Sequence, residues 1–322
     1  MPASWIISFF ALAAPPGDSS LPEPRFEKGM EIPFTGTIVD ESKRPGQLFR
    51  NEYDLSVRWL VLETSDQRTD LAILTSITPK TDPKILAAAF NISGEAAANA
   101  RTSARVDLVR WGADGTVRQL AIPTTPPPFS LPAEHRTHPL AHAPLSGPAF
   151  FEWGPLPPQQ TGRDDGERDW KRGADETWNG SRVLDLFSVT KSKNFDNLDL
   201  AVTGWRRIDR LQISPTDGLP RAYARSIEQR EGKSIISIVT THLEKKPNVP
   251  AGDPVAMRNL RREAEMAAFY IAEWERWQSG GRKLEPNGAK ILRARVERYL
   301  AEQHPRTSFR AAIDAMTRQI QE

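Results

Sequence analysis

The sequence predicts an α+β protein: two antiparallel β domains, joined by a proline-rich connector and followed by a C-terminal unit of three helices. Three observations support this class. Apolar and polar residues alternate in short segments over residues 31–123 and again over 166–246. Eleven prolines separate the two regions, between Pro123 and Pro158. Residues 252–322 instead carry apolar side chains at helical spacing. Each β domain is compatible with an open sheet, a half-barrel or a sandwich.

The chain begins with an apolar segment, Met1–Ala14, which ends in small residues. About ten apolar residues closing on an Ala-x-Ala sequence are typical of a secretory signal peptide. The run is shorter than the ~20 residues that a lasting membrane anchor needs. No Lys or Arg precedes Trp5, so the positive segment of such leaders is missing, and an apolar N-terminus packed on the fold is the alternative. We expect residues 1–14 to be a signal peptide and the protein to be exported in soluble form, to the periplasm or the extracellular space.

Composition excludes several classes of function. The chain has no cysteine, which excludes disulfides, thiolate-bound metals, thiol nucleophiles and acylation of an N-terminal cysteine. The formal net charge is only +2 and no basic face is evident, so no nucleic-acid partner is expected. Phosphate-binding and dinucleotide-binding glycine motifs, serine-hydrolase elbows and zinc-protease motifs do not occur in the sequence, and no cofactor is implied.

The first β domain is placed at residues 25–122. Its clearest strand is Tyr53–Val61, where every second residue is large and apolar while Asp54, Ser56 and Arg58 occupy the alternate positions. A glycine-flanked turn at 112–115 predicts a hairpin between two further strands. We expect an antiparallel sheet with one face buried and the other solvated.

The connector is placed at residues 123–160, because proline supplies no backbone N–H and cannot continue a helix or a central strand. It contains the most concentrated set of possible metal ligands, His135, His138 and His142. Their spacing does not fit one helical face, and a structural zinc site normally has four ligands. A solvated loop is the alternative interpretation.

The second β domain is placed at residues 161–248, where short turns separate successive alternating segments. The turns at 214–218 and 231–232 predict hairpins, so the segments should form a meander. The helical unit is placed at 252–322, and its apolar stripes must be buried. We expect them to pack within the chain, against the second sheet.

Four tryptophans near or within the second β domain are candidate ligand-binding residues, because aromatic rings interleaved with arginines can line a groove for a sugar or a lipid. The alternative is that they fill the core. These residues are Trp153, Trp170, Trp178 and Trp205.

The segments Gly204–Gly218 and Ala222–Arg230, which contain Trp-Arg-Arg, Ser-Pro-Thr-Asp-Gly and Ile-Glu-Gln-Arg, resemble a group of uncharacterised exported proteins of planctomycete bacteria. The resemblance covers the second β domain and the helical tail, and it implies no activity. The meander also resembles, at the level of fold alone, the half-barrel sheets of periplasmic lipoprotein carriers.

These observations favour an exported, non-enzymatic protein that binds a ligand or an envelope partner on a face of its sheets. Two alternatives remain open. One is a metal-dependent hydrolase that uses His135, His138 and His142. The other is a structural envelope protein that acts through its C-terminal helices.

Overall fold

The computed structural model describes residues 21–44, 47–80, 103–112, 117–120, 170–197, 199, 202–250, 254–276, 287–303, 307–310, 312–314 and 317. Four of the sequence predictions fall outside these residues: the signal peptide at 1–14, the connector at 123–160, the three histidines within that connector, and Trp153.

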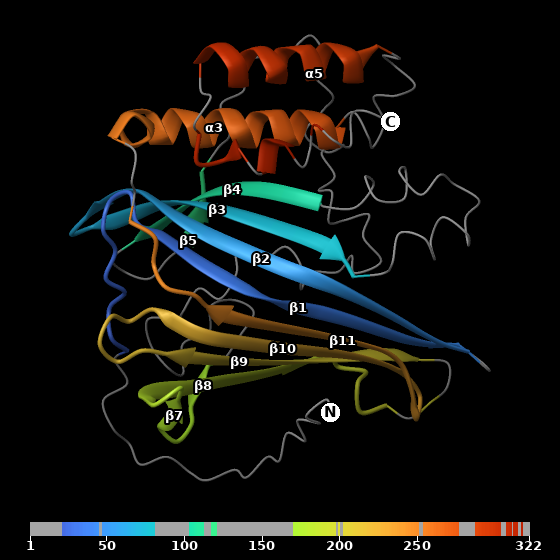
Figure 1. Ribbon diagram of the computed structural model, residues 1–322. Helices are drawn as coiled ribbons and strands as arrows, with labels where there is room; N and C mark the ends of the chain where they lie inside the picture. The colour runs from blue at the N-terminus through green and yellow to red at the C-terminus, as the bar shows by residue number, and fades with distance from the viewer. Residues whose placement is uncertain are drawn as a thin grey trace.

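The strands form one antiparallel sheet (Figure 1). Their order across the sheet is β5-β4-β3-β2-β1-β11-β10-β9-β8-β6, and β7 pairs with β8 beside this path. The strands have the following bounds: β1 Glu31–Arg44, β2 Gln47–Ser65, β3 Arg68–Pro79, β4 Ser103–Gly112, β5 Val117–Gln119, β6 Lys171–Arg172, β7 Glu176–Trp178, β8 Ser181–Lys191, β9 Thr203–Ile213, β10 Pro220–Glu231 and β11 Ser234–Lys245.

The predicted antiparallel β class with a helical C-terminal unit is confirmed, but the two β regions are not separate sheets. Strand β1 pairs with β11 over nine residues, from Phe34 opposite Lys245 to Ser42 opposite Ser237. Gly36 lies in this seam, where a Cβ would come within 1.7 Å of the His242 carbonyl oxygen, so the close approach of the two strands requires glycine. The pairing partner of β1 is about 200 residues away in the sequence, and no local pattern could have identified it.

One face of this sheet carries the larger core and is called the inner face below. Its apolar side chains come from both halves of the sheet, from β4 to β8, and include Trp59, Phe34, Trp111, Leu211 and Leu186. The predicted alternation of β2 is confirmed, since Tyr53, Leu55, Val57, Trp59 and Val61 all lie in this core.

The opposite, outer face is covered by helices over β2, β3 and β4 (Figure 1). The helix α3 (Pro254–Arg276) lies next to the strands, and α5 (Gly288–Arg298), which continues as one π-helical turn at Tyr299–Gln303, lies beyond it. Neither described helix is long and apolar enough to cross a membrane.

This helical layer corrects two expectations. The helices pack within the chain as predicted, but against the first β region rather than the second. As a result the segments of β2, β3 and β4 beneath the helices are buried on both faces, whereas the outer face of β2 stays solvated around Asp54. The strand residues that pack beneath the helices on the outer face are all apolar: Leu60, Leu62, Ala72, Leu74, Val106 and Leu108.

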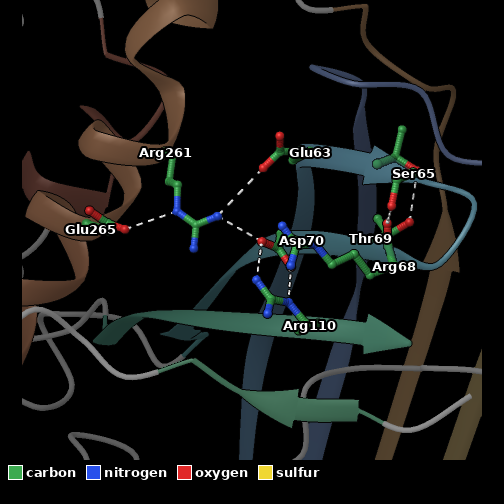
Figure 2. A network of polar contacts seen from close by, with 9 residues as sticks. Glu63, Ser65, Arg68, Thr69, Asp70, Arg110, Arg261 and Glu265 are labelled. Atoms are coloured by element: carbon green, nitrogen blue, oxygen red, sulfur yellow. Dashed lines mark hydrogen bonds and ion pairs between the residues drawn. The ribbon is translucent and has the colours of Figure 1, made fainter. Parts of the chain in front are cut away.

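A buried carboxylate fixes α3 to the sheet (Figure 2). Asp70 of β3 has no exposed side-chain surface and accepts two hydrogen bonds from Arg110, at 2.7 and 2.9 Å. It accepts a third, at 2.8 Å, from Arg261 of α3, which also pairs with Glu265. Burial alone raises the pKa of Asp70, but hydrogen bonds and charge from the two arginines outweigh it and lower that pKa. The network therefore holds the helix layer in register with β3 and β4.

Candidate functional site

The two ends of the inner face differ in chemistry. At one end the surface of the sheet is apolar, and residues 21–30 lie across it. There the Arg25 N–H donates to the Asp217 carbonyl, the Gly29 N–H donates to that of Val61, and the ring of Phe26 packs 5.5 Å from that of Trp111. The N-terminal segment thus bridges β4 to the β9–β10 turn. We call the opposite end, which carries buried charges, the polar end.

The centre of the polar end is Asp209 of β9, which is fully buried. Its carboxylate accepts hydrogen bonds from the Arg225 Nε at 2.7 Å, the Arg207 Nε at 2.6 Å and the Tyr223 hydroxyl at 2.6 Å. Burial by itself raises the pKa of Asp209, but the charges of Arg225 and Arg207 and the hydrogen bonds outweigh it, and the pKa is lowered. Asp209 is therefore ionised and held in place.

Ser188 of β8 lies beside this cluster, directly opposite Asp209 in the strand register. Only 1% of its surface is exposed, and its Oγ makes no hydrogen bond to any residue that the structure describes. Buried hydroxyls normally have a partner, because leaving one unpaired costs about 1–3 kcal/mol. Ser188 thus leaves one donor and acceptor unused on the inner face.

A second buried carboxylate, Asp40 of β1, lies across the sheet from Arg207. The strand register joins them through Val239 and Ile227, which stand opposite each other on β11 and β10. Asp40 is 7% exposed, and burial raises the pKa of its carboxyl. Tyr53, on the neighbouring strand β2, has its pKa raised to about 12 by burial and by the charge of Asp40.

We call Asp40 and the cluster of Asp209 with its two arginines the walls of the polar end. The sheet surface between these two walls is mostly apolar and still accessible. Val239, Ile227 and Thr241 are half-buried, whereas the corresponding residues nearer the apolar end, such as Leu243 and Leu211, are fully buried. The polar end thus combines a small, half-buried apolar strip with a carboxylate on one side and an arginine–aspartate cluster on the other.

The three candidate tryptophans that the structure describes lie in different surroundings. Trp170 is 1% exposed and belongs to the inner core, in agreement with the core-filling alternative. Trp205 is 39% exposed and follows the strand phase of Arg207 and Asp209, which places it on the inner face beyond the polar end. Trp178 is half-buried on β7, opposite Ser181.

The polar end was missed by the sequence analysis, which named none of Asp40, Arg207 and Asp209 as a candidate site residue. A local signal was available. Arg207 and Asp209 are in phase with Leu211 and Ile213, so a period of two places all four on one face. Arg225 is likewise in phase with Tyr223 on β10.

The part of the chain that the structure describes contains no second candidate metal site. No group of three or more His, Cys, Asp or Glu side chains within those residues could hold an ion. The metal site at His135, His138 and His142 lies outside them and stays a prediction.

No protein-family model matches this chain, and no curated protein matches it. Three solved structures show low similarity. A domain assigned to an outer membrane lipoprotein-sorting protein of Vibrio parahaemolyticus is 10% identical, with 72% of this chain and 91% of that chain covered and a TM-score of 0.16. A DUF1329 family protein from Desulfovibrio piger is 10% identical, covering 70% and 88%, with a TM-score of 0.17. The ywiB protein of Bacillus subtilis is 9% identical, covering 68% and 96%, with a TM-score of 0.15. At TM-scores this low, the similarity says nothing about what this chain binds.

Proposed function

We propose that this protein is an exported binding module that holds an amphiphilic ligand, an apolar chain with a polar head, at the polar end of its inner face. The observation that carries the proposal is the half-buried strip of Ile227 and Val239 between two buried charged walls. Ligand sites are mostly apolar surfaces on which a few placed polar groups fix orientation. An alkyl chain fits the strip, and a polar head fits the walls.

Binding is a better description of this site than catalysis. Asp209 is engaged by two guanidiniums and a phenol, and its lowered pKa makes it a poor proton carrier at neutral pH. The apolar stripes of α3 and α5 are packed in the core of the chain, so they are already used by the fold itself. That packing supports the inner face, rather than the helical tail, as the surface that meets a ligand.

Export is proposed on the strength of the apolar leader. Mass spectrometry of the protein from its native host should show an N-terminus near Ala14 or Pro15, because a signal peptidase cleaves after small residues. An abundant form that retains Met1 would contradict export, and it would leave the ligand-binding proposal in place.

The binding proposal is tested with an uncharged probe, decyl maltoside, kept below its micelle concentration. Calorimetric titration of the purified chain should give saturable binding with a stoichiometry of one. Weak, non-saturating heats like those of a protein without an apolar site would contradict the proposal.

A further inference from the structure

The two buried aspartates of the inner face differ in one respect. The negative charge of Asp209 is balanced by Arg225 and Arg207, which both lie within hydrogen-bonding distance of its carboxylate. Asp40 is also buried, with 7% of its surface exposed, yet no described residue donates a side-chain hydrogen bond to it or forms an ion pair with it. An isolated buried carboxylate is costly, and proteins normally pair such a charge.

The neighbours of Asp40 supply no positive charge. On β2, Asn51 stands opposite Asp40 in the register and Tyr53 is the next residue of the same phase. On β11, Val239 stands opposite and Thr241 is the next of the same phase. Farther along the register, Arg225 of β10 stands opposite Thr241 and Arg207 of β9 stands opposite Ile227, and both are bound to Asp209.

Asp40 also stands where a ligand would meet it. It borders the half-buried strip of Val239 and Ile227, at the end of the inner face opposite residues 21–30. A buried, unpaired carboxylate that lies beside an accessible apolar strip is a candidate for a functional role. The missing partner is then expected to come from outside the chain.

We propose that Asp40 is the counter-ion for a positively charged amine on the ligand, which makes the ligand a cationic amphiphile whose head group lies against Asp40 and Tyr53. This inference rests on the proposed binding function and adds the charge of the head group. An ammonium donates hydrogen bonds to a carboxylate, and this pairing is strong where water is excluded. The phenol of Tyr53 adds an aromatic surface of the kind that attracts cations.

The test compares three probes with the same alkyl chain: decylammonium, decyl sulfate and decyl maltoside, each titrated below its micelle concentration into the full chain. The wild type should bind decylammonium about tenfold or more tightly than decyl sulfate. Asp40→Asn should abolish that preference and leave decyl maltoside binding unchanged. Asp54→Asn is the matched control, because it removes an equal charge from an exposed residue of β2. It should keep the preference.

Thermal melts of the same variants separate a binding role from a structural one. Asp40→Asn should melt at the wild-type temperature or higher, since it removes a buried charge without removing any described contact. A lower melting temperature would show that Asp40 serves the fold and would overturn the inference. So would equal binding of the two charged probes, or a preference that survives in Asp40→Asn. If decyl maltoside binds in these cases, the proposed function stands and only the cationic head group is wrong. If no probe binds, both fail.

Discussion

Replacement of Trp59 by alanine is expected to lower the free energy of unfolding by about 3–5 kcal/mol, the range for emptying a large aromatic site in a core. Trp59 has no exposed surface, stands between Ile32 and Ile73 in the strand register, and packs its ring 4.9 Å from that of Phe34. It therefore links β1, β2 and β3 on the inner face. Chemical denaturation monitored by circular dichroism measures the change.

The control for Trp59 must lie on the same strand and be exposed. Arg58, its immediate neighbour, is unsuitable because it makes two hydrogen bonds to Glu31, at 2.6 and 2.7 Å. Asp54 has 65% of its side chain exposed and only a 3.3 Å contact to Lys80, so Asp54→Ala should change stability by no more than about 0.5 kcal/mol. Equal losses for Trp59→Ala and Asp54→Ala would contradict the face assignment of β2.

Asp209→Ala is expected to cost a similar amount, about 3–5 kcal/mol, because it takes away the carboxylate shared by two buried arginines. The side chains of Arg207 and Arg225 are only 8% and 5% exposed, so water cannot readily replace it. Asp196→Ala breaks an ion pair with Lys191 whose side chains are more than half exposed, and it should stay within about 0.5 kcal/mol.

The effect of Asp209 should depend on pH. Its pKa is lowered in the folded chain, so its stabilising contribution is complete above the ordinary aspartate pKa and is lost as the pH falls through the folded value. Melts recorded from neutral pH down to below the ordinary aspartate pKa should show the difference between wild type and Asp209→Ala shrinking. A difference that stays constant or grows in acid would mean that Asp209 is not ionised in the folded protein.

Local features of the fold could be predicted from the sequence, whereas its long-range pairings could not. The alternation in Tyr53–Val61 identified an inner-face strand, because burial of one face imposes a period of two. The stripes that include Leu260 and Ile271 likewise identified a helix with a buried face. The pairing of β1 with β11, and the choice of β2–β4 as the surface beneath α3, depend on contacts between distant segments.

The candidate site was harder to predict, because charged residues in a strand normally indicate a solvated face. Asp209 and Arg207 break that rule by pairing with each other and with Arg225, which makes their burial possible. Their phase relative to Leu211 was the available signal. For Asp40, burial follows from its phase with Ile38, but the absence of a cationic neighbour becomes visible only once β11 is placed beside β1.

The central claim is that the ligand binds the inner face at its polar end, and two adjacent residues of β11 test it most directly. Val239 is half-buried on the inner face, and Thr240 is exposed on the outer face. Decyl maltoside is titrated into Val239→Asn and Thr240→Asn, with a thermal melt confirming that each variant is folded. The account predicts that Val239→Asn binds about tenfold more weakly than wild type, since one aliphatic side chain contributes about 1.5 kcal/mol or more of apolar contact, and that Thr240→Asn binds as wild type does. Unchanged affinity in Val239→Asn, or a larger loss in Thr240→Asn, would contradict it.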